Sequence, residues 1–296
     1  MRSLLFIPAD DERKLRKAIA SGADALILDL EDAVSGSRKE AAREIAAGYI
    51  GQTKSVAGRP QLYVRINGLD TPDWEKDLVG ICASGPDGIV LPKARSGEDV
   101  HKLSIGLAHA EERAAIDKGG TRVIAIATEM PISLLRMSSY VDASSRLSGL
   151  TWGAEDLSAA LGAKTTREDD GRSWRSPYRM ARDLCLITAV AAGVQPIDTV
   201  FVNLRDAEGL MGEARGAARD GFTGKMAIHP NQVAPINEAF TPAAEEVAMA
   251  TEIVRAFASN PDAGVIAVGG NMLDRAHVVR AERLLARAEA AKARRS

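Results

Sequence analysis

The sequence predicts an α/β fold, a (β/α)8 TIM barrel followed by a C-terminal helical extension. Eight apolar runs of strand length alternate with helical segments, which is the order expected of repeated βαβ units. Most of these runs are continuously apolar rather than alternating, as is typical of parallel strands covered on both faces. An open, doubly wound sheet is the alternative, because a strand is easily miscounted in a single sequence.

The expected elements of the barrel follow one another along residues 1–240. The strands are expected at residues 3–8, 25–30, 61–67, 88–92, 122–128, 147–152, 199–204 and 225–229. The helices between them are expected at residues 11–21, 38–49, 72–84, 97–118, 132–140, 176–192 and 206–219. The alternation is interrupted by a long polar loop at 163–177, which carries several arginines and a tryptophan. This loop is either a lid over an anionic ligand or a solvated surface loop.

The chain continues past the eighth strand as an extension, residues 241–296. It is expected to form a helix at 241–258, a connector containing Gly and Pro at 260–271, and a second helix at 274–295. A complete barrel does not need these residues for closure. We therefore expect the extension to pack on a neighbouring subunit.

Composition excludes several classes of protein. The 296 residues are 46% apolar and 26% charged, which is ordinary for a globular protein. A net charge of −2 gives no electrostatic reason to expect nucleic acid or an acidic membrane surface as a partner. No segment resembles a membrane span, and the N-terminal apolar run is too short for a signal peptide. Cys82 and Cys185 are expected to be buried free thiols of a cytoplasmic protein.

Two carboxylates follow successive strands and predict a metal site. Glu129 comes directly after the fifth strand, and Asp156 follows the sixth at the start of a helical segment. The C-terminal ends of parallel barrel strands meet at one face, so these side chains should lie close together. Magnesium takes few protein ligands and leaves positions for substrate oxygens. The pair therefore predicts a Mg²⁺ site.

Other polar groups stand at further strand ends. In chain order they are Glu31, Asp32, Arg65, Asn67, Lys93, Asn203, Arg205 and His229. Charged groups are rarely buried without partners, so a plug of ion pairs could explain one or two of them. A succession of polar strand ends favours an active site instead.

The residue types suggest roles. Arg65 offers a planar fork for a carboxylate or a developing enolate oxygen. Gly153 and Ala154, before a helix, could present backbone N–H groups to a substrate carboxylate. Lys93 is a candidate for a Schiff base, but nearby acids should keep it protonated and a poor nucleophile. The signatures of dinucleotide-binding, P-loop and α/β-hydrolase proteins are absent from the sequence.

Several motifs occur in the order found in one family. They are MRSLLFIP (1–8), LDLEDAV (28–34), VRIN (64–67), DTP (70–72), LPK (91–93), TE (128–129), GAEDL (153–157), GFTGK (221–225) and IHP (228–230). Each motif is weak alone, but together they make the chain resemble the citrate lyase β-subunit-like branch of the HpcH/HpaI aldolase family along nearly its full length.

The resemblance implies a Mg²⁺-dependent lyase in a TIM barrel. Such enzymes cleave or form a carbon–carbon bond between an acyl thioester and a 2-oxo acid. They include citryl, malyl and citramalyl thioester lyases, and they usually assemble as homotrimers or hexamers. The expected partners are therefore acyl-CoA, or an acyl-carrier thioester, and a 2-oxo acid. The alternatives are an aldolase on free 2-oxo acids and a citrate lyase β subunit that acts on a citryl carrier protein within a complex.

The resemblance also assigns roles by position. Glu129 and Asp156 match the metal ligands, and Arg65 matches a substrate-binding arginine. Glu31 and Asp32 are expected to support catalysis by holding Arg65, Lys93 or a metal-bound water. The motif MLD (272–274) resembles one whose aspartate, here Asp274, reaches a neighbour's active site. The alternative for that aspartate is a helix N-cap.

Two departures from the family pattern concern the substrate. The first strand is followed by Ala9-Asp10, where the family commonly has a glycine after the proline. The segment after Glu129 continues with Met130-Pro131, where many members have a small residue. Both changes alter the mouth of the site, so the acyl group or the 2-oxo acid could differ from those of other members.

Overall fold

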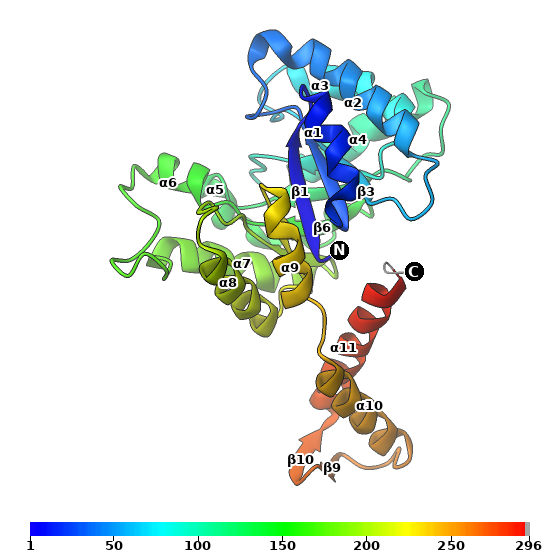
Figure 1. The fold of residues 1–296 in the computed structure, drawn as a ribbon, viewed down its shortest axis with the longest axis vertical. Helices are drawn as coiled ribbons and strands as arrows, with labels where there is room; N and C mark the ends of the chain where they lie inside the picture. The colour runs from blue at the N-terminus through cyan, green and yellow to red at the C-terminus, as the bar shows by residue number, and fades with distance from the viewer. Residues whose placement is uncertain (294–296) are drawn as a thin grey trace. The chain divides into compact units, whose positions relative to one another are not determined.

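The computed structural model describes residues 1–293 and divides the chain into two compact units (Figure 1). The first unit is Met1–Asn237, and the second begins at Glu238. Residues 294–296, which include the end of the predicted 274–295 helix and of the predicted extension, lie outside the described residues.

The first unit is a closed barrel of eight parallel strands, which confirms the predicted TIM barrel. Closure is direct, because β1 pairs with β2 on one side and with β8 on the other. An open sheet is thereby excluded. The strands are β1 (Ser3–Pro8), β2 (Ala25–Asp29), β3 (Gln61–Arg65), β4 (Gly88–Leu91), β5 (Arg122–Ile126), β6 (Leu147–Thr151), β7 (Gln195–Asp198) and β8 (Gly224–Ala227).

Helices connect the strands around the outside of the barrel (Figure 1). They are α1 (Glu12–Ala18), α2 (Lys39–Thr53), α3 (Asp73–Ile81), α4 (Gly97–Arg113), α5 (Pro131–Leu134), α6 (Glu155–Leu161), α7 (Ser176–Ala191), α8 (Ala207–Asp220) and α9 (Val233–Ala239). Side chains cap several of them; Asp206 accepts a hydrogen bond from the Gly209 N–H at the start of α8. The predicted helix at 132–140 is two short pieces, α5 and a 3-10 turn at Met137–Tyr140.

Apolar side chains from alternate strand positions fill the barrel. The buried cluster contains Leu4, Ala25, Ile27, Tyr63, Val90, Ile124, Ile126, Ile197 and Met226. The ring of Tyr63 needs the space left by a glycine, since a Cβ on Gly88 would lie 2.7 Å from its Cδ1. The two cysteines are buried free thiols, as predicted.

The seventh strand was predicted in the wrong place. The apolar run 199–204 suggested it, but the structure forms β7 at Gln195–Asp198. A proline within a run argues against a strand, yet Pro196 occupies β7, where its carbonyl accepts the Thr223 N–H. Asn203 and Arg205 consequently lie in the exposed loop before α8 and not at a strand end.

The second unit contains a helical pair and a hairpin. Its elements are α10 (Ala244–Ala258), β9 (Val265–Val268), β10 (Asn271–Asp274) and α11 (Arg275–Ala293). The prediction of a plain connector at 260–271 was wrong, because β9 and β10 pair in antiparallel fashion there. Gly269 and Gly270 both have positive φ, 56° and 81°, which is the conformation a two-residue hairpin turn requires. Over residues 1–293, no helix has the length and apolar character needed to span a membrane.

Candidate active site

A cavity of about 430 Å³ lies at the C-terminal ends of the barrel strands. Residues at or just after seven of the eight strands line it, and the predicted site residues among them are Asp32, Arg65, Glu129, Gly153, Ala154 and Asp156. Glu31 and Lys93 join the same cluster through ion pairs with these side chains. The barrel therefore brings these eight predicted residues together at one face.

Arg65, at the end of β3, is held by two carboxylates. Its Nε and Nη2 donate to the two carboxylate oxygens of Asp29 at 2.7 and 2.5 Å, and its Nη1 lies 2.9 Å from Glu31 Oε2. Its guanidinium also lies over the Phe6 ring, 4.9 Å from the centroid. Burial alone would lower the pKa of Arg65, but the hydrogen bonds and charge of Asp29, with the charge of Glu31, raise it above its usual range. The guanidinium is thus charged and fixed in orientation.

Lys93 sits between three acids. Its Nζ donates to Glu31 Oε1 at 2.5 Å and to both oxygens of Asp32 at 3.3 Å, and it lies 3.8 Å from Asp156 Oδ1. Burial lowers the pKa of Lys93, but the hydrogen bond and charge of Glu31 and the charge of Asp32 raise it above the ordinary value. A protonated amine is a poor nucleophile, so this geometry argues against a Schiff base.

Glu129 is a deeply buried carboxyl group of the cavity, at 4% exposure. Burial raises its pKa to about 8; the Lys93 backbone N–H, which donates to Oε2 at 2.5 Å, opposes this, whereas the charge of Asp156 raises it further. A Cβ on Gly153 would lie 2.9 Å from Glu129 Cγ, so the glycine leaves room for this side chain. In the absence of a cation, Glu129 would hold a proton at neutral pH.

The donor set fits a hard divalent cation. Glu129 and Asp156 line the same cavity, and the charge of Asp156 raises the pKa of Glu129, a repulsion that a bound cation would relieve. Among residues 1–293, no group of three or more His, Cys, Asp or Glu side chains is arranged to hold a metal. Two carboxylates suffice for Mg²⁺, which keeps several positions for water or substrate oxygens.

The loop after β6 differs from the prediction in one respect. The N–H of Gly153 donates to Thr128 Oγ1 at 3.1 Å, so in this arrangement it is not available to a substrate carboxylate. Ala154 precedes the first residue of α6 and lines the cavity. A contribution from its N–H stays a prediction.

Asp274 belongs to the second unit, where it caps α11. Its Oδ1 accepts from the N–H groups of Ala276 at 3.1 Å and His277 at 3.4 Å, and it lies 2.6 Å from His277 Nδ1. The hydrogen bond with His277 lowers the pKa of Asp274, whose side chain is exposed. The N-cap alternative is therefore confirmed. The catalytic role of Asp274 stays a prediction.

Sequence reasoning missed Asp29, Asp198 and Lys225, three charged groups that the strands bury. Asp29 positions Arg65, and Lys225 donates to Asp198 at 2.6 Å. The signal was present as a charged residue inside an otherwise apolar run, which requires a partner. His229, by contrast, accepts the Asn231 N–H at 3.2 Å and caps a 3-10 turn.

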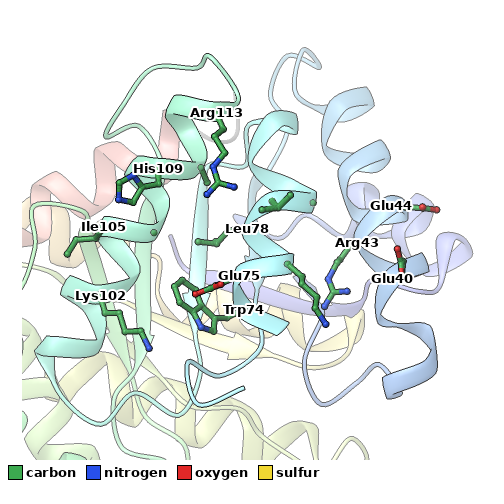
Figure 2. Close-up of a pocket in the computed structure, with 15 residues that line it drawn as sticks. Glu40, Arg43, Glu44, Trp74, Glu75, Leu78, Lys102, Ile105, His109 and Arg113 are labelled. Atoms are coloured by element: carbon green, nitrogen blue, oxygen red, sulfur yellow. The ribbon is translucent and has the colours of Figure 1, made fainter. Parts of the chain in front are cut away.

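A larger cavity, about 990 Å³, lies on the outer face between α2, α3 and α4 (Figure 2). Trp74 and Leu78 lie in it, with Glu40 on one side and Lys102 on the other. Of the described residues that line it, none was predicted from a strand end. The predicted site residues thus line the smaller cavity and not this one.

The chain is similar to a known family and to several of its members. Residues 2–230 match the family model of HpcH/HpaI aldolase/citrate lyase. The chain is 35% identical over 291 residues to citrate lyase subunit beta of Leuconostoc mesenteroides subsp. cremoris, covering 98% of this chain and 93% of that one. It is 34% identical over 307 residues to an L-malyl-CoA/beta-methylmalyl-CoA lyase of Cereibacter sphaeroides, covering 97% and 94%.

One solved structure resembles the chain over almost its whole length. This is CitE from Mycobacterium tuberculosis in complex with magnesium, acetoacetate and coenzyme A, with a TM-score of 0.76 and 33% identity. The match covers 98% of this chain and 100% of that one. The similarity thus includes the second unit as well as the barrel.

Proposed function

The chain belongs to the HpcH/HpaI aldolase/citrate lyase family and is a carbon–carbon lyase, and from this premise we propose that it acts on a 3-hydroxyacyl thioester with the help of Mg²⁺. The candidate substrates are malyl-, citramalyl- and citryl-CoA. Cleavage would give an acyl-CoA and a 2-oxo acid, and condensation would reverse it. The observation that carries the proposal is a fixed, charged Arg65 beside the carboxyl pair of Glu129 and Asp156 in one cavity.

Glu129 and Asp156 would hold the magnesium ion. The chemistry that Mg²⁺ supplies when bound is polarisation of the keto oxygen of the 2-oxo acid. The CitE structure, which is 33% identical in sequence, contains magnesium together with acetoacetate and coenzyme A.

Arg65 would bind the oxygens on which negative charge develops. In the cleavage direction a base removes the proton of the substrate hydroxyl, the carbon–carbon bond breaks, and its electron pair moves onto the thioester as an enolate. Asp29 and Glu31 hold the guanidinium in place before the reaction, so its reorientation costs little during the step. Glu31 and Asp32 also hold Lys93 in its charged form.

Asp274 would protonate the enolate from a neighbouring subunit, or remove a proton from the acyl group in the reverse direction. This role requires a homo-oligomer, with a trimer or hexamer expected. It would give the second unit a function in the reaction.

A citrate lyase β subunit is the second candidate. It is supported by the 35% identity to citrate lyase subunit beta of L. mesenteroides. Such a subunit would act on a citryl carrier protein within a complex, while an aldolase on free 2-oxo acids would need no thioester at all. The three hypotheses predict cleavage of different substrates, so an activity assay can distinguish them.

The first test is a substrate panel. The purified protein is incubated with Mg²⁺ and malyl-, citramalyl- or citryl-CoA, and release of a 2-oxo acid is followed. Cleavage of at least one compound is expected, and Glu129→Gln should abolish it. If none is cleaved although Mg²⁺ raises the melting temperature, the CoA thioester proposal is wrong, and a carrier thioester or a free acid is tested next.

The role of Asp274 in a neighbouring site can be tested by mixing subunits. Asp274→Ser keeps an N-cap for α11 but removes the carboxylate, so it separates chemistry from helix stability. Asp274→Ser and Glu129→Gln should each be inactive, whereas oligomers assembled from both at equal amounts should recover about a quarter of the wild-type sites. No recovery in mixed oligomers would show that Asp274 does not act across subunits.

A further inference from the structure

Six side chains of the first unit form a closed ring of contacts beside the catalytic cavity. In order around the ring they are Trp152, Asp198, Lys225, Glu213, Arg167 and Trp174. They come from the strand end after β6, from β7, β8 and α8, and from the loop at 163–175. The ring therefore joins the wall of the cavity to a loop on the outside of the barrel.

The inner half of the ring is deeply buried. The indole N–H of Trp152 donates to Asp198 Oδ1 at 2.8 Å, and Lys225 Nζ donates to Asp198 Oδ2 at 2.6 Å. Both Asp198 and Lys225 are 0% exposed. Buried charges must be paired and hydrogen-bonded, so the position of Trp152 is tied to an ion pair that cannot move without a large cost.

The outer half of the ring links this buried ion pair to the loop at 163–175. Lys225 Nζ also donates to Glu213 Oε1 at 2.8 Å, and Arg167 Nη2 donates to Glu213 Oε2 at 2.7 Å. The Arg167 guanidinium lies over the Trp174 ring, 3.2 Å from its centroid. Trp174 then meets Trp152 edge to face, with ring centroids 4.9 Å apart. Stacking on a planar guanidinium and edge-to-face packing both fix ring orientation.

The loop itself is a small ordered hairpin. Arg167 and Trp174 form a β-bridge, Glu168 N–H donates to the Ser173 carbonyl at 2.8 Å, and Arg175 N–H donates to the Thr166 carbonyl at 3.0 Å. Arg167 Nη1 also donates to the Arg172 carbonyl at 2.5 Å. The same arginine thus holds the hairpin together and links it to α8.

One member of the ring, Trp152, lies beside the proposed catalytic groups. Trp152 lines the catalytic cavity and precedes Gly153, which lies against Glu129. A shift of Trp152 would therefore move the cavity wall and the backbone beside the buried carboxyl group. We propose that Arg167 is a positioning residue, which sets the shape of the substrate cavity through Trp174 and Trp152 and so controls substrate binding.

The first test is spectroscopic and needs no substrate. The chain has three tryptophans, and the two in the ring are close enough to couple, which produces an exciton couplet in the circular dichroism spectrum. Arg167→Met should collapse the couplet. Arg179→Met, on the adjacent first turn of α7, should leave it unchanged, as should Trp74→Phe in α3. A couplet that persists in Arg167→Met would overturn the proposal.

The second test measures kinetics and rests on the proposed lyase function. Arg167→Met should raise KM by on the order of tenfold, with kcat changed by less than about threefold, because the cavity wall contacts substrate and transition state alike. Arg167→Lys keeps the ion pair with Glu213 but lacks the planar group that stacks on Trp174, so it should recover only part of the loss.

The two tests fail in different ways. A collapsed couplet with unchanged KM and kcat would show that the ring is structural only, and would overturn the positioning role. If no thioester is cleaved, the kinetic arm is replaced by pyruvate binding in the presence of Mg²⁺, measured as a shift in melting temperature. Arg167→Met should then weaken pyruvate binding, and Arg179→Met should not; equal binding in both variants would overturn the proposal.

Discussion

Magnesium binding should release a proton from Glu129. With a pKa raised to about 8 by burial, this group holds its proton in the cation-free protein at neutral pH. A metal ligand must be ionised, so binding at pH 7 should release about 0.9 proton per Mg²⁺, and at pH 9 only about 0.1. The apparent affinity for Mg²⁺ should accordingly rise between pH 6 and pH 8 and then level off.

The same shift predicts how stability varies with pH. The folded pKa of Glu129 lies above its ordinary value of 4.5, so its contribution to stability is fully present below pH 4.5 and is lost as pH rises through about 8. The loss should be on the order of a few kcal/mol in the cation-free protein. Bound Mg²⁺ reverses the trend, because it compensates the ionised carboxylate. The stabilisation by Mg²⁺ should therefore increase with pH.

Titration calorimetry measures the released protons directly. Mg²⁺ is added at pH 7 and pH 9 in pairs of buffers that differ in ionisation enthalpy, and the slope of heat against that enthalpy gives the proton count. Glu129→Gln should abolish the release. Asp156→Asn should reduce it at pH 7, because the charge of Asp156 raises the pKa of Glu129. Tight Mg²⁺ binding with a release below about 0.2 at both pH values would refute the reasoning.

Three further outcomes follow from the contacts. Arg65→Met should lower kcat/KM by on the order of a thousandfold, the cost of losing one oxyanion donor, in steady-state assays of whichever thioester proves to be cleaved. Glu111→Gln breaks a buried two-pronged ion pair, so urea unfolding at pH 7 should show a loss of about 3 kcal/mol. That wild-type contribution is present above pH 4.5 and is lost as pH falls through about 2. Burial raises the pKa of Glu111, but the hydrogen bonds from Arg146, Gly119 and Thr121 and the charge of Arg146 together lower it to about 2. Gly153→Ala should reduce the rise in melting temperature caused by Mg²⁺, because its Cβ would approach Glu129; Gly48→Ala in α2, with no described atom within 4 Å, should not.

The barrel was predictable because most strands are continuous apolar runs that end at charged residues. Glu129, for example, follows β5, in which four of five residues are buried. β7 broke the pattern, since Pro196 lies inside it and a more apolar run follows it. The hairpin of β9 and β10 was not predicted because its strands have four residues each, which is too few to show an alternation of apolar and polar residues.

The site was predictable as a set of positions but not as a set of contacts. Parallel strands bring Arg65, Glu129 and Asp156 to one face whatever their partners are. Which atoms pair depends on distances that no local pattern encodes. Arg167 and Glu213 are 46 residues apart, and their ion pair depends on where α8 packs. The loop at 163–177 could therefore be recognised as unusual, but its order could not be foreseen.

The two charged clusters of the barrel differ in their balance of acidic and basic groups. Asp198 and Glu213 contact three cationic residues, Lys225, Arg167 and Arg182, so the acids of that cluster are fully compensated and it behaves as a buried plug. In the catalytic cluster, the described contacts join two cationic residues, Arg65 and Lys93, to five carboxyl groups: Asp29, Glu31, Asp32, Glu129 and Asp156. Three of these acids, Asp29, Glu31 and Glu129, are buried, so the surplus of negative charge would be costly without a further cation. The surplus is relieved here by a proton on Glu129 in the cation-free state, and a divalent cation would relieve it better, because it neutralises two charges where the proton neutralises one. The excess of acids is thus itself the argument for a metal-dependent site.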